Sequence, residues 1–199
     1  GGRSGIEEYL ALGYVAADLT DGSVSKTQEY AWDDFAIANL ATAIGEDADA
    51  ARFAGQSRTI STLFDPAEGF FRGRNADGTW AGELNPETWH EYFVEGNAWQ
   101  HLWLTPYPDL LVELLGSRDA VVAKLDELFT RSKEYWEWTD LGTIAPQPYY
   151  WQGNEPDIHA PFLYAALGRP EGAQVWSRWI MAEHYGLGPK GLPGNADAG

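Results

Sequence analysis

The sequence predicts a mostly α-helical fold, and three observations support this prediction. Apolar residues recur at helical spacing in several segments, and glycine or proline stands near the ends of these segments. Long loops rich in glycine and proline separate them. The chain has 199 residues, of which 44% are hydrophobic and 22% are charged, values typical of a globular chain of about one domain.

The predicted elements alternate between helices and loops. The first clear helix covers residues 28–44, where apolar side chains from Tyr30 to Ile44 keep a helical period and Gly45 ends it. Ser117 is a suitable N-cap for the helix that follows it. Further helices are expected at 46–63, 92–104, 108–115, 118–134, 159–168 and 171–185, with loops at 68–82 (including a hairpin around Asp77-Gly78), 139–156 and 186–199.

This order of helix, short turn, helix and long loop is typical of paired helices in an α/α toroid. Long loops in a compact domain are usually functional, and in such toroids the loops at one end build the site. A closed toroid needs more helices than this chain supplies. The sequence therefore predicts a partial toroid with long functional loops.

The composition excludes several classes of function. Thirty Asp and Glu against 13 Lys and Arg give a net charge of −17, which disfavours binding to nucleic acid and to anionic membranes. No apolar run approaches the ~20 residues of a membrane span. The absence of cysteine excludes disulfides, thiolate metal sites and cysteine nucleophiles. Ten Trp, 10 Tyr and 8 Phe beside these carboxylates suit a surface for sugars or cations, although composition alone favours a large core with an acidic solvated surface.

The segment from Glu95 to Gln100 concentrates groups that carry chemistry. It reads Glu-Gly-Asn-Ala-Trp-Gln, and on a helix Glu95 and Trp99 share one face. A carboxyl group beside an indole loses contact with water, which favours its protonated form and suits a general acid. The alternative is a first helical turn in which the glutamate is a cap.

Two loop segments add oxygen ligands. Gln152-Gly153-Asn154-Glu155-Pro156 offers amide and carboxylate oxygens that suit a hard cation such as calcium, or sugar hydroxyls, and equally forms a turn. In 191–197, the glycines allow a close approach of the backbone to a ligand, and Asp197 is able to hold a metal or activate water. Such clusters are mostly plain turns.

Together, these segments carry a resemblance to one family. They are Ser25–Asp34, Leu63-Phe64-Asp65-Pro66, Gly69-Phe70-Phe71-Arg72-Gly73-Arg74, Glu95–Gln100, Gly153-Asn154-Glu155-Pro156 and Gly191–Asp197. In this order and rough spacing the chain resembles glycoside hydrolase family 92, the calcium-dependent exo-α-mannosidases, over residues 3–199. The resemblance implies a parent with an N-terminal β-sandwich and an α/α toroid. Residues 1–199 would be a segment of the toroid, to which other segments of the same protein add the remaining helices and the β-sandwich.

The resemblance also implies roles for individual residues. It makes Glu95 the general acid and Asp197 the general base of an inverting hydrolysis of terminal α-mannosyl links. It assigns Ca²⁺ to Asn154, Gln100 and Asp197. It assigns substrate binding to Glu155, Gln152, His159, Arg74 and Trp99, and gives Asp33 and Asp34 only as weaker candidates that equally form structural ion pairs. The implied substrates are mannose-containing glycans, and the implied location is secreted, periplasmic or on the cell surface.

Three departures from the family pattern bear on function. Ala196 stands where the base loop usually has the first of two aspartates, Gln152 and Gly153 stand where α-1,2-specific members have His and an acidic residue, and the paired histidine of the family is reduced to His159. These departures keep a second hypothesis open, a mannose- or glycan-binding protein that has lost turnover. A purely structural helical segment is the third, and the six ordered motifs argue against it.

Overall fold

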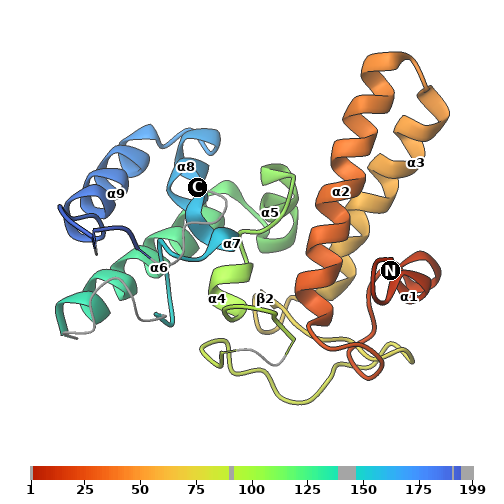
Figure 1. The fold of residues 1–199 in the computed structure, drawn as a ribbon, viewed down its shortest axis with the longest axis horizontal. Helices are drawn as coiled ribbons and strands as arrows, with labels where there is room; N and C mark the ends of the chain where they lie inside the picture. The colour runs from red at the N-terminus through yellow and green to blue at the C-terminus, as the bar shows by residue number, and fades with distance from the viewer. Residues whose placement is uncertain (1, 90–91, 139–146, 190, 194–199) are drawn as a thin grey trace.

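The computed structural model describes residues 2–89, 92–138, 147–189 and 191–193, and in this part of the chain the mostly α-helical prediction is confirmed. Two helical halves lie side by side, with two short helices between them (Figure 1). The elements are α1 (Ile6–Leu12), α2 (Ser23–Ile44), α3 (Asp47–Ser57), the 3-10 helix η1 (Arg58–Leu63), strands β1 (Phe64–Asp65) and β2 (Phe70–Phe71), α4 (Ala98–His101), α5 (Pro108–Leu115), α6 (Arg118–Trp138), α7 (Glu155–Ile158), α8 (Ala160–Ala166) and α9 (Pro170–Glu183).

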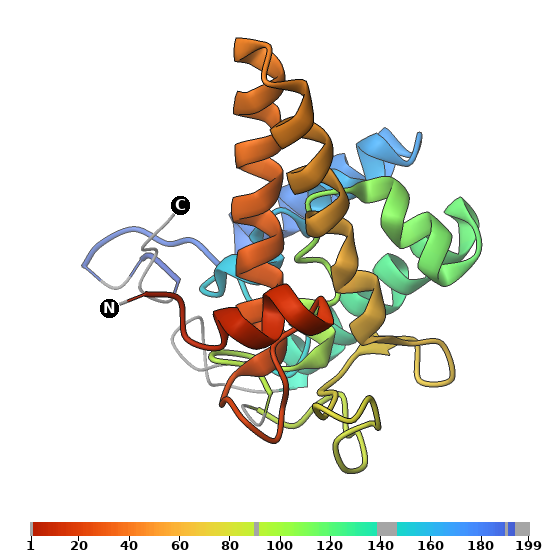
Figure 2. The same ribbon diagram turned by 90° about the vertical axis from the view of Figure 1, so that its right-hand side faces the viewer.

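The N-terminal half is built on the hairpin of α2 and α3, which rises from the rest of the molecule (Figure 2). Gly45 ends α2 in the left-handed conformation (φ 81°), and its N–H is donated to the carbonyls of Ala41 and Thr42. The predicted helix 46–63 is wrong as a single element, because the α-helix ends at Ser57 and continues as the tighter η1.

The second half repeats the helix-turn-helix arrangement. Helix α5 spans Pro108–Leu115, as predicted, and Gly116 closes it with φ 92°. The predicted N-cap is confirmed, since Ser117 Oγ accepts a hydrogen bond of 3.1 Å from the Ala120 N–H. Helices α8 and α9 form another pair, so the helices pair as expected for a toroid segment.

Two short helices and a hairpin shape the region between the halves. The predicted helix over 92–104 is wrong in its extent: α4 covers only Ala98–His101, because Gly96 is left-handed and Asn97 is the N-cap. Helices α1 and α7 were not predicted. The hairpin around Asp77-Gly78 is confirmed by the antiparallel bridge between Arg74 and Trp80.

One hydrophobic core runs through both halves. Trp103, Phe129, Tyr150 and Tyr164 are among its largest fully buried side chains, and Leu63 joins it from η1. A smaller cluster of Tyr9, Val15 and Tyr30 fastens α1 to α2. The two halves therefore share one packed interior.

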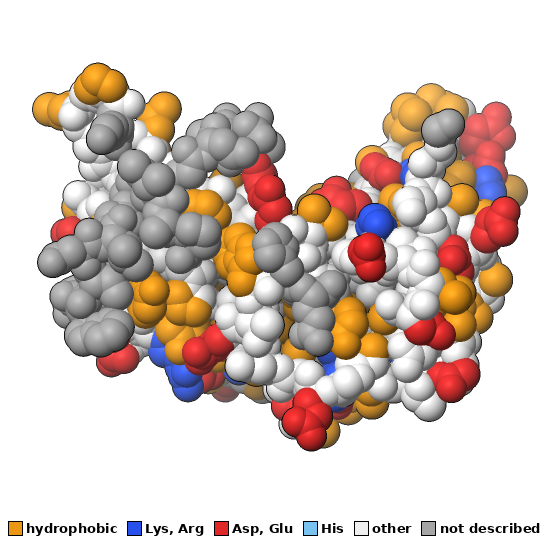
Figure 3. All heavy atoms as spheres, turned by 60° about the horizontal axis from the view of Figure 1, so that its bottom comes forward, with side chains coloured by type: hydrophobic (Ala, Val, Ile, Leu, Met, Phe, Trp, Pro, Cys, Tyr) orange, Lys and Arg blue, Asp and Glu red, His pale blue; other side chains and the backbone are white. Residues whose placement is uncertain are grey.

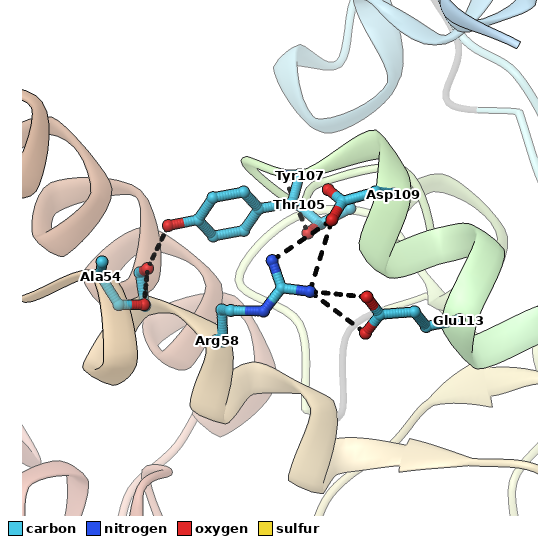
Figure 4. A network of polar contacts seen from close by, with 7 residues as sticks. Ala54, Arg58, Thr105, Tyr107, Asp109 and Glu113 are labelled. Atoms are coloured by element: carbon cyan, nitrogen blue, oxygen red, sulfur yellow. Dashed lines mark hydrogen bonds and ion pairs between the residues drawn. The ribbon is translucent and has the colours of Figure 1, made fainter. Parts of the chain in front are cut away.

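An exposed polar junction also links the halves (Figure 4). Arg58 forms ion pairs of 3.5 Å with Asp109 and 2.9 Å with Glu113 on α5, and its guanidinium lies 4.8 Å from the centre of the Tyr107 ring. The Tyr107 hydroxyl lies 2.7 Å from Ser57 Oγ. We call these residues the Arg58 junction.

Candidate active site

A pocket of about 500 Å³ lies where α2 meets the loop before α4 and the start of α7. On the face shown in Figure 3, a notch separates the two halves and acidic side chains stand on both sides of it. The pocket is lined by Ser25, Lys26, Glu29, Tyr30, Val94, Glu95, His101, Asn154, Glu155 and Pro156. The structure thus brings together three residues that the sequence singled out, Glu95, Asn154 and Glu155, from two motifs that are far apart in the chain.

Glu95 stands in a bend before α4, with its side chain exposed to the pocket. The next residue must be glycine: Gly96 has φ 89°, and an added Cβ would lie 2.4 Å from Gln100 Oε1 and 2.6 Å from Asn154 Nδ2. Asn97 caps α4 by accepting from the Gln100 N–H at 3.2 Å. Gly96 and Asn97 therefore fix the backbone from which the Glu95 side chain projects.

The expected pairing of Glu95 with Trp99 on one helical face is wrong. Glu95 precedes the helix, so the two are not related by a helical turn. Trp99 is buried instead against Phe70, at 4.9 Å between ring centres, and Tyr149, at 5.7 Å. Lys124 Nζ lies 4.0 Å from the centre of its indole.

A chain of buried amides supports the pocket. Gln100 Nε2 donates to the main-chain carbonyls of Gln147 at 2.6 Å and Tyr149 at 2.8 Å. Because both of its amide hydrogens are used, Oε1 must face the other way, where it accepts from Asn154 Nδ2 at 2.7 Å. The orientation of Asn154 is then fixed too, and its Oδ1 is buried without a hydrogen-bond partner among the described residues.

This unpartnered oxygen bears on the calcium that the resemblance implies. A buried amide oxygen without a hydrogen-bond donor is rare in proteins because it is unfavourable, and such an oxygen is suited to act as a ligand of a cation. Gln100 Oε1 keeps a second lone pair, and Glu155 lines the same pocket. In the ranges that the structure covers, no group of three or more His, Cys, Asp or Glu is placed to hold a metal. The amide oxygens thus fit a hard cation, as part of a larger ligand set.

Three carboxylates, Glu29, Glu95 and Glu155, line the pocket against one ammonium group, that of Lys26. Partial removal from water, and then the nearby carboxylates of Asp33 and Glu155, raise the pKa of Glu29 above its usual range. Lys26 lies one turn before Glu29 on α2. A cationic ligand or a hydroxyl donor is therefore favoured here over an anion.

His101 closes the floor of the pocket and is buried. Its Nε2 lies 2.5 Å from the main-chain carbonyl oxygen of Glu95, and its Nδ1 lies 2.7 Å from Gln28 Oε1. Burial lowers the pKa of His101 to about 4, so the ring is neutral at pH 7.

Three further predicted site residues, Arg74, Gln152 and His159, are not part of the pocket lining. Arg74 Nε donates to the Gly78 carbonyl at 2.8 Å, within the hairpin. Gln152 Nε2 donates to the Tyr185 hydroxyl at 2.9 Å. His159 Nε2 lies 2.9 Å from the Trp103 carbonyl. Asp197 lies outside the described residues. For all four, the predicted roles stay predictions.

The two weaker candidates have structural partners. Asp33 forms a 2.7 Å ion pair with Arg3, and Asp34 accepts from the Tyr9 hydroxyl at 2.8 Å. Sequence reasoning did not single out Lys26, Glu29 or His101. Lys26 and Glu29 stand within Ser25–Asp34, one of the motifs that carry the family resemblance, and that membership was the only sign of them in the sequence. His101 directly follows the Glu95–Gln100 motif.

The chain is similar to known glycosidases. It is 25% identical over 232 residues to an "Uncharacterized secreted glycosidase" of Arthroderma benhamiae, covering 100% of this chain and 28% of that protein. It matches the family GH92 inverting mannosidase BT2199 of Bacteroides thetaiotaomicron with a TM-score of 0.87 and 28% identity, over 98% of this chain and 28% of that one. The family GH92 α-mannosidase BT3965 of the same organism, in complex with mannoimidazole, matches with a TM-score of 0.82 and 31% identity, over 96% and 26%.

The chain thus spans less than a third of the length of each of these relatives. The model of the glycosyl hydrolase family 92 catalytic domain matches residues 1–199, which is every residue of the sequence. This chain therefore belongs to glycosyl hydrolase family 92, as part of that family's catalytic domain.

Proposed function

We propose that this chain carries the acid and the base of an exo-α-mannosidase site that hydrolyses terminal α-mannosyl linkages in glycans with inversion. The observation that supports this most is the pocket in which the exposed Glu95 meets Asn154 and Glu155. The two Bacteroides relatives are described as an inverting mannosidase and an α-mannosidase, which supports mannose as the sugar.

Inverting hydrolysis needs a carboxylic acid on the leaving oxygen and a carboxylate that activates water, about 6.5–9.5 Å apart. Glu95 is placed for the acid role because its side chain lines the pocket and its backbone is fixed by Gly96 and the Asn97 cap. We propose Asp197 as the base. The Glu29 and Glu155 carboxylates are placed to accept hydrogen bonds from sugar hydroxyls in the pocket.

We further propose that Asn154 Oδ1 and Gln100 Oε1, together with Asp197, hold a calcium ion. When bound, calcium would supply positive charge to orient and distort the terminal sugar. The protein's own contribution is to fix the orientation of both amides, which the bonds from Gln100 to Gln147 and Tyr149 and from Asn154 to Gln100 achieve.

We also propose that residues 1–199 are a segment of the α/α toroid and that other segments of the same protein complete the site. The relative from Arthroderma benhamiae is described as secreted, which supports a location outside the cytoplasm or at the cell surface. Among the described residues, no helix combines the length and the apolar character that crossing a membrane requires.

The test is release of mannose from an α-mannoside by the protein that carries this chain. We expect turnover that EDTA abolishes and added Ca²⁺ restores, and that Glu95→Gln abolishes without loss of folding. Glu113→Gln is the matched control, because it makes the same change at an exposed ion pair of the Arg58 junction. Turnover that is equal in Glu95→Gln and the wild type would refute the acid role.

A second candidate is a glycan-binding protein on the same scaffold. It is favoured by Ala196, which occupies the position of one of the two aspartates usual in the base loop. Calcium-dependent mannose binding without turnover in the wild type would support this candidate and contradict the first.

A further inference from the structure

We propose that His101 is a positioning residue for Glu95, which it holds by donating its Nε2–H to the main-chain carbonyl of Glu95. This inference rests on the proposed role of Glu95 as the general acid. His101 does not need to touch the substrate. It acts through the backbone of the residue that does.

The geometry places His101 at the centre of three short contacts. Nε2 lies 2.5 Å from the Glu95 carbonyl, Nδ1 lies 2.7 Å from Gln28 Oε1, and Gln28 Nε2 donates to the carbonyl of His101 itself at 2.6 Å. All of this is buried, since His101 is 2% exposed and Gln28 is 0% exposed. The Phe93 ring packs against the imidazole at 4.8 Å.

A count of protons shows why the ring orientation matters. A carbonyl oxygen only accepts, so the Glu95 contact requires a proton on Nε2. The amide nitrogen of Gln28 donates to the His101 carbonyl. The oxygen Oε1 therefore faces the ring, and as an acceptor it requires a proton on Nδ1. A neutral imidazole carries one N–H, and both contacts compete for it.

The competition is settled by which partner is able to move. Gln28 reaches the ring through its side chain, so a small rotation about its last torsion lengthens the contact of Oε1 with Nδ1 while Nε2 stays on the His101 carbonyl. The Glu95 carbonyl is fixed, because Gly96 at φ 89° and the Asn97 cap define the backbone on its C-terminal side. A lone pair facing this oxygen at 2.5 Å would be strongly repelled. The proton therefore belongs on Nε2.

The consequence falls on the acid. The backbone of Glu95 is held on one side by the turn at Gly96 and on the other by Phe93, which is buried, whereas Val94 between them is exposed. Without the bond from His101, the Glu95 carbonyl loses this hydrogen bond and its segment gains freedom. Misplacement of a reacting group by about 1 Å is able to cost as much as 100-fold in rate.

The experiment compares two replacements that keep different halves of the ring. His101→Gln retains a donor near the position of Nε2, and His101→Asn retains one only near Nδ1. We expect His101→Gln to keep kcat on an α-mannoside within a few fold, and His101→Asn to lower it about tenfold to a hundredfold with KM nearly unchanged. His184→Asn is the control, because His184 is another buried histidine but lies at the end of α9.

A merely structural role predicts another pattern. In that case both His101 variants would lose activity in proportion to their loss of folded protein, which thermal unfolding measures. Equal kcat losses in the two variants, or wild-type kcat in His101→Asn, would overturn the proposal.

Nitrogen NMR of the histidine rings in the wild-type protein provides a readout independent of turnover and of the variants' folding. We expect a protonated Nε2 for His101 at neutral pH. If the wild type shows no turnover, the proposed function fails, while the NMR result still decides the position of the proton. An unprotonated Nε2 would overturn the proposal even in an active enzyme.

Discussion

Two places where the N-terminal half meets the rest of the chain differ in chemistry. At the Arg58 junction, three exposed charged side chains and a tyrosine meet above the surface of the core. At the other place, buried polar groups link α2 to α4 and α4 to α7, through Gln28, His101, Gln100 and Asn154. We call these four residues the buried polar link.

The difference teaches where the molecule is tolerant and where it is not. An exposed ion pair contributes about 0–1 kcal/mol, because water and salt screen it and long side chains lose freedom. A buried amide that loses one partner leaves the other unpaired, at about 1–3 kcal/mol for each group. The candidate active site adjoins the buried polar link, so its geometry is defined by groups that cannot be changed one at a time without cost.

The largest expected effect is a loss of catalysis when the carboxyl group of Glu95, which adjoins the buried polar link, is replaced by an amide. We expect Glu95→Gln to reduce kcat for α-mannoside hydrolysis by about 10²–10⁴-fold, because a general acid contributes about that much. Glu113→Gln at the Arg58 junction should leave kcat unchanged. Release of mannose under saturating substrate is the measurement, and a similar loss in both variants would remove the contrast between the two places.

The next largest effect is on stability. We expect Gln100→Leu to lower the free energy of unfolding by about 3 kcal/mol, because three groups lose their hydrogen-bond partner: the buried Gln147 carbonyl and Asn154 Nδ2, and the partly buried Tyr149 carbonyl. Urea unfolding measures it. Gln174→Leu makes the same change at an exposed position of α9 and should cost less than about 0.5 kcal/mol. Equal costs would show that burial of the amide carries no weight.

The third effect is a dependence of stability on pH, and it concerns a buried histidine that belongs neither to the Arg58 junction nor to the buried polar link. His184 stacks on Trp136 at 4.4 Å, and burial lowers its pKa to about 4 from 6.5. The unfolded chain therefore binds a proton at a higher pH than the folded chain does. The contribution to stability is present above pH 6.5 and is lost as the pH falls toward 4.

We expect His184→Phe, which keeps an aromatic ring there, to remove this loss. The difference in unfolding free energy between variant and wild type should be constant above pH 7 and should grow in favour of the variant by up to about 3 kcal/mol at pH 4. Urea unfolding across this pH range is the measurement. A difference that does not vary with pH would contradict a lowered pKa for His184.

The smallest effect belongs to the Arg58 junction. We expect Glu113→Gln to change the free energy of unfolding by less than about 1 kcal/mol, because the pair is exposed and Asp109 still faces Arg58. The change should shrink further as salt is raised. A loss of more than about 2 kcal/mol that persists in high salt would show that the Arg58 junction contributes as much to stability as the buried polar link.

Local patterns predicted the parts of the fold that depend on local chemistry. Helix α5 begins at Pro108 and ends before Gly116, as the sequence indicated, and Ser117 caps α6. The short α4 was predicted too long, because its apolar residues continue in sequence while Gly96 and Asn97 stop the helix. Here a backbone turn that serves the pocket overrides the apolar period.

The site was predictable only in part for a related physical reason. Glu95, Asn154 and Glu155 carry chemistry in short motifs, so the sequence pointed to them. The partners of Gln100 are main-chain carbonyls 47 and 49 residues further on, and Gln28 lies 73 residues before His101. No local pattern records such contacts. The roles of Gln152, His159, Arg74 and Asp197 stay predictions.

The central claim is that Glu95 protonates the leaving oxygen, and the dependence of rate on the leaving group tests it most directly. The measurement is the ratio of wild-type to Glu95→Gln kcat/KM on two α-mannosides, one with an acidic phenol as leaving group and one with a sugar. A good leaving group departs without a proton, so we predict a much larger ratio for the sugar than for the phenol. Equal ratios for the two substrates would contradict the account.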